Sequence, residues 1–439
     1  MTPSLQRPVV TELRLSPFAA HRDTTVPLAA PLTLLAGPSG SGKSTALRAY
    51  EGLARLAAGE ELAAAFPDPA ACVPEGAGVL DGPAALDGAA AWDGPAAWDG
   101  AGAWDGARAL DGAGALDGPA ALDGAAAPVS AVDRGPFRIG CTVDGPDGPV
   151  RLDLAVRAEP RLRIVGERLT SGGTTLLSTA PVRGRGHRRV QAAWHTHDAS
   201  GAGGARGTRA ATRAVLPDDR LATALLPLHV AGRTEGQLRV LAAAEQTVVA
   251  LRSLFACDPQ PERMRRPAPE GDGRLLRGCG NLADVLHRTR SECARRHGRL
   301  AAAARAGCAG PVADLTAEAL ADGTVRALLD RGAGRAATPV ERLGDGELRF
   351  LALALVLLTG PGVLAVEQAS EIPSAYQTLA VLADGLDRCL DAAQLRELLA
   401  LAAEMCARGH IRLVGTVTDA TAASVARGVE GASMVDLHL

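Results

Sequence analysis

The sequence of 439 residues lacks lysine almost entirely: Lys43 is the only one, and arginine supplies the other basic side chains. Aromatic residues make up only 3% of the chain, and the eight cysteines include no C-x-x-C pair. This cysteine pattern argues against both a zinc site and a disulfide framework, and it fits a reducing cytoplasm. The 47% apolar content nevertheless suffices for a sizeable core, so we expect a globular protein.

Long hydrophobic runs are also missing. The most apolar run, 350–358, is followed by Thr-Gly-Pro-Gly and is too short for a membrane span, which needs about 20 residues. We predict a buried helix there. The first ten residues have no positive region followed by an apolar stretch, so no secretory signal is predicted. The net charge of −3 argues against non-specific coating of nucleic acid. We therefore expect a cytoplasmic protein with no membrane partner.

A glycine-rich segment carries the clearest functional signal. It matches G-x-x-x-x-G-K-[S/T] and consists of Gly37, Pro38, Ser39, Gly40, Ser41, Gly42, Lys43, Ser44 and Thr45. In such a loop, backbone N–H groups surround phosphate oxygens at a helix N-terminus. Lys43 would reach the β- and γ-phosphates, and the Ser44 hydroxyl would bind Mg²⁺. Because a broad guanidinium cannot replace a compact ammonium in this pocket, the single lysine strengthens the prediction of ATP and Mg²⁺ as ligands.

The flanking segments fit this loop. Residues 9–15 alternate as a strand does, residues 31–36 form a second apolar strand, and a helix is predicted from Ser44 to about Ala57. Further strands are predicted at 137–143, 150–158 and 162–167, forming an antiparallel sheet. A polar, arginine-rich loop over 183–213 and helices over 235–254 and 281–306 should follow. The order strand, loop, helix is the one that a phosphate loop requires.

Between these segments the sequence repeats every six residues from Leu80 to Leu122, with Leu-Asp-Gly or Trp-Asp-Gly in each unit. Such a period can build a short β-helix. The interpretation we favour is a low-complexity insertion rich in Ala, Gly and Pro.

Segment 10–44, which ends in the phosphate loop, resembles the N-terminal lobe of RecF- and SMC-type ABC ATPases, including Phe18 after the first strand. Segment 343–368, LGDGELRFLALALVLLTGPGVLAVEQ, resembles that family's signature motif, helix and Walker B strand. Segments 258–267 and 280–286 are similar to bacterial RecF-like proteins of the AAA-family ATPases. The resemblance covers most of the chain except the repeat and the 183–213 loop.

This resemblance implies an α/β P-loop NTPase of ABC/RecF type, with a two-lobed head, an antiparallel side sheet and a helical lid region. ATP would lie between the P-loop of one subunit and the signature residues Gly344, Asp345, Gly346 and Glu347 of a second, giving an ATP-dependent homodimer. The expected domains are an N-terminal P-loop lobe (1–77), the repeat insertion (78–128), the rest of the side sheet (129–180), an arginine-rich loop with a helical region (181–335) and a C-terminal lobe (336–439).

The resemblance also assigns the catalytic positions, and several depart from the family pattern. A buried strand over 363–366 should deliver Glu367 to the Mg²⁺ shell. The next residue, normally a catalytic glutamate, is Gln368. Gly344 replaces the signature serine and offers only its backbone N–H, and Val417 replaces the switch histidine after Thr416. No Q-loop glutamine is identifiable. Slow hydrolysis is therefore expected.

Nearby carboxylates could compensate for these losses, and we considered Glu371 and Asp419. The stretch 384–387, Asp-Gly-Leu-Asp, is interpreted as a helix end in preference to a dimer-facing turn. Residues 411–415 resemble the family's final core strand.

The remaining candidates are weaker. His195 and His197 form a His-x-His pattern, but a solvated turn is favoured over a metal site. The arginines of the 183–213 loop could contact phosphate backbones, so DNA is a candidate partner, although a solubilising role is favoured.

The leading hypothesis is a RecF/SMC-like ATPase that dimerises on MgATP and hydrolyses it slowly, in DNA repair or phage defence. The alternative is a hydrolysis-deficient, nucleotide-gated regulatory or binding module. A transporter ATPase subunit and a P-loop kinase fit the sequence less well.

Overall fold

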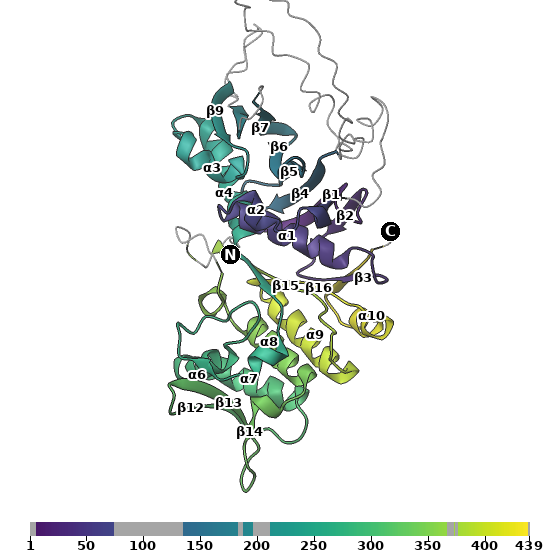
Figure 1. Cartoon of the computed structure of the whole chain (residues 1–439), viewed down its shortest axis with the longest axis vertical. Coiled ribbons are helices and arrows are strands. Elements are labelled where there is room, and N and C mark those ends of the chain that lie inside the picture. The colour runs from purple at the N-terminus through teal and green to yellow at the C-terminus, as the bar shows by residue number, and fades with distance from the viewer. Residues whose placement is uncertain are drawn as a thin grey trace, which may run out of the picture. The chain divides into compact units, whose positions relative to one another are not determined.

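The computed structural model describes residues 6–73, 135–182, 188–195, 211–366, 373 and 376–437 (Figure 1). The six-residue repeat predicted as an insertion lies outside these residues, as do 183–187 and 196–210 of the arginine-rich segment.

An eight-stranded antiparallel sheet contains the strands predicted in the first half of the chain. Its order is β2-β1-β4-β5-β6-β7-β8-β9. The strands are β1 (Val9–Ser16), β2 (Thr24–Pro27), β4 (Phe137–Asp144), β5 (Val150–Arg157), β6 (Arg163–Ser171), β7 (Thr174–Pro181), β8 (Arg189–His195) and β9 (Ala211–Pro217). The predicted strands at 9–15, 137–143, 150–158 and 162–167 are thus confirmed, with shifts of a few residues at their ends.

The predicted polar loop over 183–213 is wrong at β8 and at the start of β9. In β8, the buried Val190, Ala192 and Trp194 alternate with Arg189 and Gln191. This period of two is a strand signal. The many arginines and glycines around it hid the signal in the sequence.

The second sheet is parallel and has the order β10-β15-β16-β3-β17. Its strands are β3 (Leu32–Ala36), β10 (Leu254–Cys257), β15 (Leu379–Ala383), β16 (Ile411–Thr416) and β17 (Ala432–Asp436). All residues of β3 and β15 are buried, which is typical of parallel strands covered on both faces. The strand predicted at 411–415 is confirmed as β16, but it is not the final core strand, because β17 follows it.

A third, small sheet contains β11 (Ala268–Pro269), β13 (Thr324–Asp330), β12 (Asp314–Ala319) and β14 (Thr338–Pro339). The helices are α1 (Lys43–Ala57), α2 (Leu62–Ala65), α3 (Ala222–His229), α4 (Glu235–Arg252), α5 (Pro261–Met264), α6 (Leu282–Glu292), α7 (Ala294–Gly307), α8 (Asp345–Leu358), α9 (Ala392–Ala407) and α10 (Ala420–Arg427). Short 3-10 turns are η1 (Ala70–Cys72), η3 (Val340–Arg342) and η4 (Pro361–Val363). The helix predicted over 281–306 is broken at Cys293, whose φ of −150° and ψ of 86° are not helical. No helix in the described ranges is long and apolar enough to cross a membrane.

Helix α1 packs between the antiparallel and the parallel sheets. The predicted apolar side of this helix, which includes Leu47 and Leu53, is buried. One hydrophobic cluster joins Leu53 of α1 to Leu152 of β5 and Leu382 of β15. The start of α1 is therefore held in place by apolar packing on two sides, and this helix start carries the glycine-rich loop.

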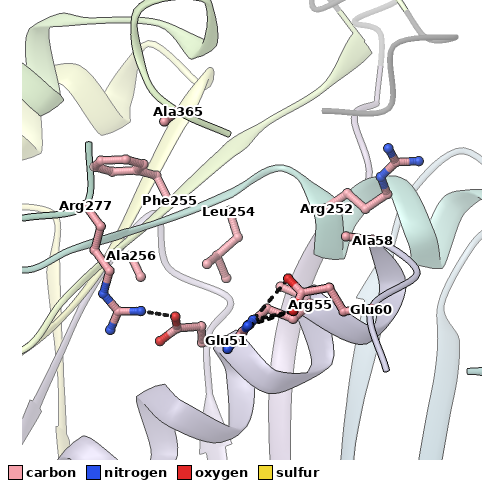
Figure 2. A pocket seen from close by; sticks show the side chains of 11 residues that line it. Glu51, Arg55, Ala58, Glu60, Arg252, Leu254, Phe255, Ala256, Arg277 and Ala365 are labelled. Atoms are coloured by element: carbon pink, nitrogen blue, oxygen red, sulfur yellow. Dashed lines mark hydrogen bonds and ion pairs between the residues drawn. The ribbon is translucent and has the colours of Figure 1, made fainter. Parts of the chain in front are cut away.

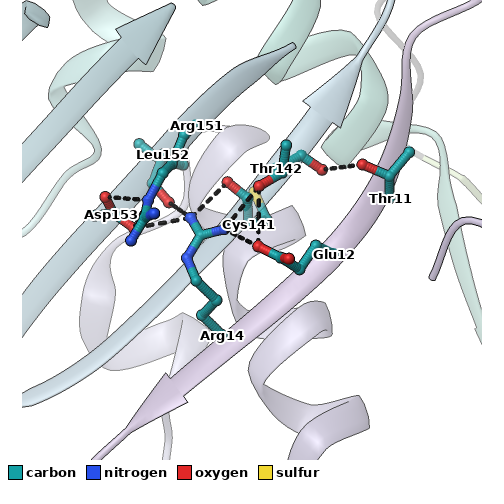
Figure 3. Close-up of polar contacts among 8 residues, drawn as sticks. All are labelled: Thr11, Glu12, Arg14, Cys141, Thr142, Arg151, Leu152 and Asp153. Atoms are coloured by element: carbon teal, nitrogen blue, oxygen red, sulfur yellow. Dashed lines mark hydrogen bonds and ion pairs between the residues drawn. The ribbon is translucent and has the colours of Figure 1, made fainter. Parts of the chain in front are cut away.

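A buried arginine ties three strands of the antiparallel sheet together on the face opposite α1 (Figure 3). Arg14 is 5% exposed and donates to Asp153 Oδ1 at 2.8 Å, to Thr142 Oγ1 at 2.7 Å and to the carbonyl of Cys141 at 3.0 Å. Gly140 lies between Arg14 and Asp153 in the strand register. A Cβ at Gly140 would lie 2.7 Å from Asp153 Oδ1, so glycine leaves room for the ion pair.

We predict that Arg14→Ala lowers the free energy of unfolding by about 3 kcal/mol, because it breaks the buried ion pair with Asp153 and leaves that carboxylate only its contacts with the more exposed Arg151. Urea unfolding of the two proteins measures this difference. The control is Arg326→Ala, which removes the half-exposed ion pair with Glu318 and should cost about 1 kcal/mol or less. Equal losses in the two variants would contradict the prediction.

Candidate functional site

The glycine-rich loop connects β3, which ends at Ala36, to α1, which begins at Lys43. Gly37, Gly40 and Gly42 have φ values of 146°, 84° and 82°, a region that residues with a Cβ rarely adopt. A Cβ at Gly37 would also lie 2.4 Å from the carbonyl oxygen of Leu437. The glycines predicted from the motif are therefore required by the backbone path of the loop.

Lys43 lies inside this loop. Its side chain is folded back so that Nζ donates to the carbonyls of Gly37 at 2.7 Å and Pro38 at 2.8 Å, and the residue is only 8% exposed. The ammonium group is thus held close to the loop backbone at the N-terminus of α1. Positive charge and helix N–H groups at one place favour a phosphate group.

The next side chain along α1 reaches an acid on the parallel sheet. Ser44 Oγ donates to Asp384 Oδ1 at 2.9 Å. Thr416 Oγ1 donates to the same carboxylate oxygen at 2.7 Å. Asp384 immediately follows β15, and Thr416 ends β16, so adjacent parallel strands deliver both residues to the loop.

This geometry differs from the expectation of a buried strand at 363–366. Residues 361–363 form the turn η4, Leu364 makes only an isolated bridge with Leu275, and Ala365 is exposed. The strand expectation is therefore wrong. Glu367 and Gln368 lie outside the described residues.

The interpretation of 384–387 as a helix end is also wrong, because these residues follow a strand. The sequence did contain a signal: the apolar run Leu379–Ala383 ends directly at Asp384. In the family that the sequence resembles, the strand that ends in the acid follows the signature helix closely, and this pattern pointed to 363–366. In this chain about 20 residues lie between the end of α8 and the start of β15.

The turn after Asp384 contacts the segment that follows β16. Asp387 Oδ2 accepts from the Thr418 N–H at 2.9 Å and the Asp419 N–H at 3.0 Å. Val417 is buried, and its N–H donates to the carbonyl of Leu35 at the end of β3. Asp419 is exposed at the start of α10. Glu371 lies outside the described residues.

The signature-like residues lie at the start of α8. Gly344 and Asp345 are exposed, and Glu347 Oε2 accepts from the Gly344 N–H at 3.0 Å. Glu347 Oε1 also accepts from Ala309 N–H at 2.8 Å, and Asp345 Oδ1 accepts from Arg265. In the described structure these hydrogen bonds do not join the signature-like residues to the P-loop. The single N–H that Gly344 could offer a ligand is bonded to Glu347.

His21 contacts the P-loop, and no sequence pattern predicts this contact. Its Nε2 lies 3.0 Å from the carbonyl oxygen of Gly42, and its Nδ1 lies 3.1 Å from Thr24 Oγ1. A Cβ at Gly42 would lie 2.4 Å from His21 Nε2. Burial lowers the pKa of His21, although the bond to Gly42 acts in the opposite direction. The neutral imidazole therefore supports the last turn of the loop.

The donor set at this site fits Mg²⁺. The Ser44 hydroxyl and the Asp384 carboxylate are oxygen ligands, which Mg²⁺ prefers. Mg²⁺ commonly takes only one or two protein ligands and completes its shell with phosphate and water. Within the described ranges, no cluster of three or more His, Cys, Asp or Glu side chains is arranged to hold a metal by itself.

A cavity of about 350 Å³ lies elsewhere, between the second half of α1 and β10 (Figure 2). Four of its five charged lining residues pair with one another, Glu51 with Arg277 and Glu60 with Arg55, and the fifth is Arg252. The lining contains no residue of the P-loop. This cavity is therefore separate from the candidate phosphate site.

No protein-family model matches the chain, and no curated protein matches it. Among solved structures, the chain is similar to an SMC head bound to the C-terminal winged-helix domain of ScpA, with 11% identity, 95% of this chain and 91% of that chain covered, and a TM-score of 0.44. It is also similar to an SMC head domain with an extended coiled coil bound to the C-terminal domain of ScpA, derived from Pyrococcus furiosus. That similarity has 10% identity, covers 95% of this chain and 92% of that chain, and has a TM-score of 0.42. A third similar structure is the SMC head domain from Thermotoga maritima, with 12% identity, 98% of this chain and 100% of that chain covered, and a TM-score of 0.40. At these TM-scores, the assignment of a P-loop rests on this chain's own loop geometry and strand order.

We predict that the wild-type protein loses stability relative to His21→Gln as the pH falls below about 6.5, the ordinary pKa of histidine. The folded-state pKa is lowered, so the unfolded state binds the proton first, and stability is lost as the pH falls toward the folded-state value. Thermal unfolding from pH 7.5 to 5.5 measures this. His410, whose pKa is also lowered by burial, is present in both proteins and cancels. Identical pH profiles would contradict the prediction.

Proposed function

We propose that the chain is a RecF/SMC-like P-loop ATPase that binds MgATP, dimerises on it and hydrolyses it slowly. The observation that carries this proposal is the hydrogen bond from Ser44, beside Lys43, to Asp384 at the end of a neighbouring parallel strand. A phosphate loop alone shows phosphate binding, whereas a hydroxyl paired with an acid is the arrangement that P-loop NTPases use for Mg²⁺.

Each residue has a defined role in this proposal. The N–H groups of the loop and the Lys43 ammonium bind the β- and γ-phosphates, so Lys43 must leave the carbonyls of Gly37 and Pro38. Ser44 and Asp384 hold Mg²⁺, which neutralises phosphate charge when bound. This role of Asp384 replaces the one first expected for Glu367. Thr416 orients the Asp384 carboxylate.

Slow hydrolysis follows from the residue after the acid. In the family that the sequence resembles, a glutamate at that position polarises the attacking water. Here the residue after Asp384 is Gly385, which has no side chain. Loss of a general base typically lowers the rate about 10²- to 10⁴-fold. We therefore expect the protein to retain nucleotide binding and to hydrolyse ATP slowly.

Dimerisation would place Gly344 and Asp345 of one subunit against the nucleotide of the other. Their exposure at the start of α8 is compatible with this role. Glu347 occupies the Gly344 N–H and adds negative charge there, so the γ-phosphate contact is weaker than a serine would provide. The resemblance suggests DNA repair or phage defence as the setting and DNA as a candidate partner.

The second candidate is a nucleotide-gated module without hydrolysis. Two residues favour this module: Gly385, which follows Asp384, and Val417, which follows Thr416. Neither supplies a polar side chain. Binding and dimerisation are common to the two candidates, so turnover separates them.

We predict ATP hydrolysis by the purified protein that is lost in Lys43→Ala, since that variant lacks the cation for the β- and γ-phosphates. Steady-state phosphate release with and without DNA measures turnover, and light scattering with and without ATP measures dimerisation. ATP binding without Lys43-dependent turnover supports the nucleotide-gated module. No Mg²⁺-dependent ATP binding by the wild type would refute both candidates.

A second experiment tests which acid serves Mg²⁺. Asp384→Asn should remove most of the Mg²⁺-dependent gain in ATP affinity, because it removes the charge beside Ser44. Glu367→Gln should keep that gain. Titrations with a fluorescent ATP analogue in Mg²⁺ and in EDTA measure it. The reverse pattern would return the role to Glu367.

A further inference from the structure

Helix α8 carries a buried arginine that reaches the turn beside the acid. Arg349 is 3% exposed. Its Nη1 donates to the carbonyl of Pro259 at 2.8 Å, and its Nη2 donates to the carbonyl of Gly385 at 3.0 Å. One guanidinium therefore joins α8, the segment after β10 and the segment after β15.

This arginine sits in an unfavourable place for a cation. Burial lowers the pKa of Arg349, and the nearby Arg388 lowers it further, although Asp258 opposes them. Its hydrogen bonds in the described structure go to neutral carbonyls, which compensate a buried charge less well than a carboxylate does. An apolar side chain would satisfy the packing of α8, so packing does not account for the guanidinium.

The peptide that Arg349 holds is the one that follows Asp384. Gly385 has a φ of 59°, a left-handed conformation. Its N–H donates to Thr416 Oγ1 at 2.7 Å, and Thr416 Oγ1 donates to Asp384 Oδ1 at 2.7 Å. Gly385 is thus fixed on both sides, by Thr416 at its N–H and by Arg349 at its carbonyl. These two bonds fix the turn that directly follows Asp384.

We propose that Arg349 is a positioning residue that aligns Asp384 for the metal through the carbonyl of Gly385; this inference rests on the proposed function. Arg349 lies in the second turn of α8, the helix whose N-cap is the exposed Gly344. The same contact therefore links the start of α8, which carries the signature-like residues, to the acid that is proposed to hold Mg²⁺, within one subunit.

The test is a double-mutant cycle on ATP affinity, measured with the fluorescent analogue in Mg²⁺ and in EDTA. Arg349→Met should weaken binding in Mg²⁺ about 10- to 100-fold, the usual effect of losing a group that orients a metal ligand. Binding in EDTA should stay at the wild-type value, because the loop and Lys43 are untouched. Arg349→Lys, which keeps the charge and can reach one carbonyl, should lose less.

In an Asp384→Asn background, Arg349→Met should have no further effect on the Mg²⁺-dependent part, since both changes act on one interaction. Arg412→Met is the matched control. Arg412 is also partly buried and donates to the backbone carbonyls of Ala29 and Ala30, but these lie before β3, away from the acid. It should leave the Mg²⁺ dependence unchanged.

A merely structural role for Arg349 would weaken binding equally in Mg²⁺ and in EDTA, or would add fully to Asp384→Asn, and either result overturns the inference. Wild-type protein that binds ATP no better in Mg²⁺ than in EDTA contradicts the proposed function itself. The wild-type titrations thus distinguish the two failures.

Discussion

The hydrogen bond from Ser44 to Asp384 connects the two parts of the chain that the site needs. Ser44 belongs to the helix packed between both sheets, whereas Asp384 directly follows β15 of the parallel sheet, 340 residues later. In this sheet β15 lies beside β16 and β16 lies beside β3, and this order brings the acid and Thr416 to the loop. The strand order, the burial of β3 and β15, and the glycines of the loop can all be understood as conditions for this contact.

The sequence predicted the loop because its chemistry is contiguous: three glycines, one lysine and the hydroxyl of Ser44 lie within nine residues. It predicted β1 and α1 because each has a clear local period, and β3 because an apolar run leads directly into the loop. The expected acid was assigned to Glu367 from the spacing of the family motifs, whereas about 20 residues separate α8 from β15, which ends directly before Asp384. His21 and Arg349 were missed because their roles come from tertiary contacts, and an isolated histidine or arginine carries no pattern in the sequence.

The polar groups around Asp384 hold the neighbouring backbone in place rather than transfer protons. Arg349 and Thr416 hold the two sides of Gly385, Asp387 holds the segment after β16, and Val417 fills an apolar position. Such a site can keep a carboxylate in one direction without a neighbouring base. Under the proposed function, such an arrangement stabilises the bound state more than the reacting one, so nucleotide binding with slow turnover is expected.

The scarcity of lysine has a chemical consequence for the whole chain. Lys43 is the only side-chain amine, and it is folded into the phosphate loop against two carbonyls. Acylation or any other modification of a lysine side chain can therefore occur only at this phosphate loop. An amine-directed label on a side chain would thus report directly on that loop, and a bound triphosphate that engages Lys43 would protect it.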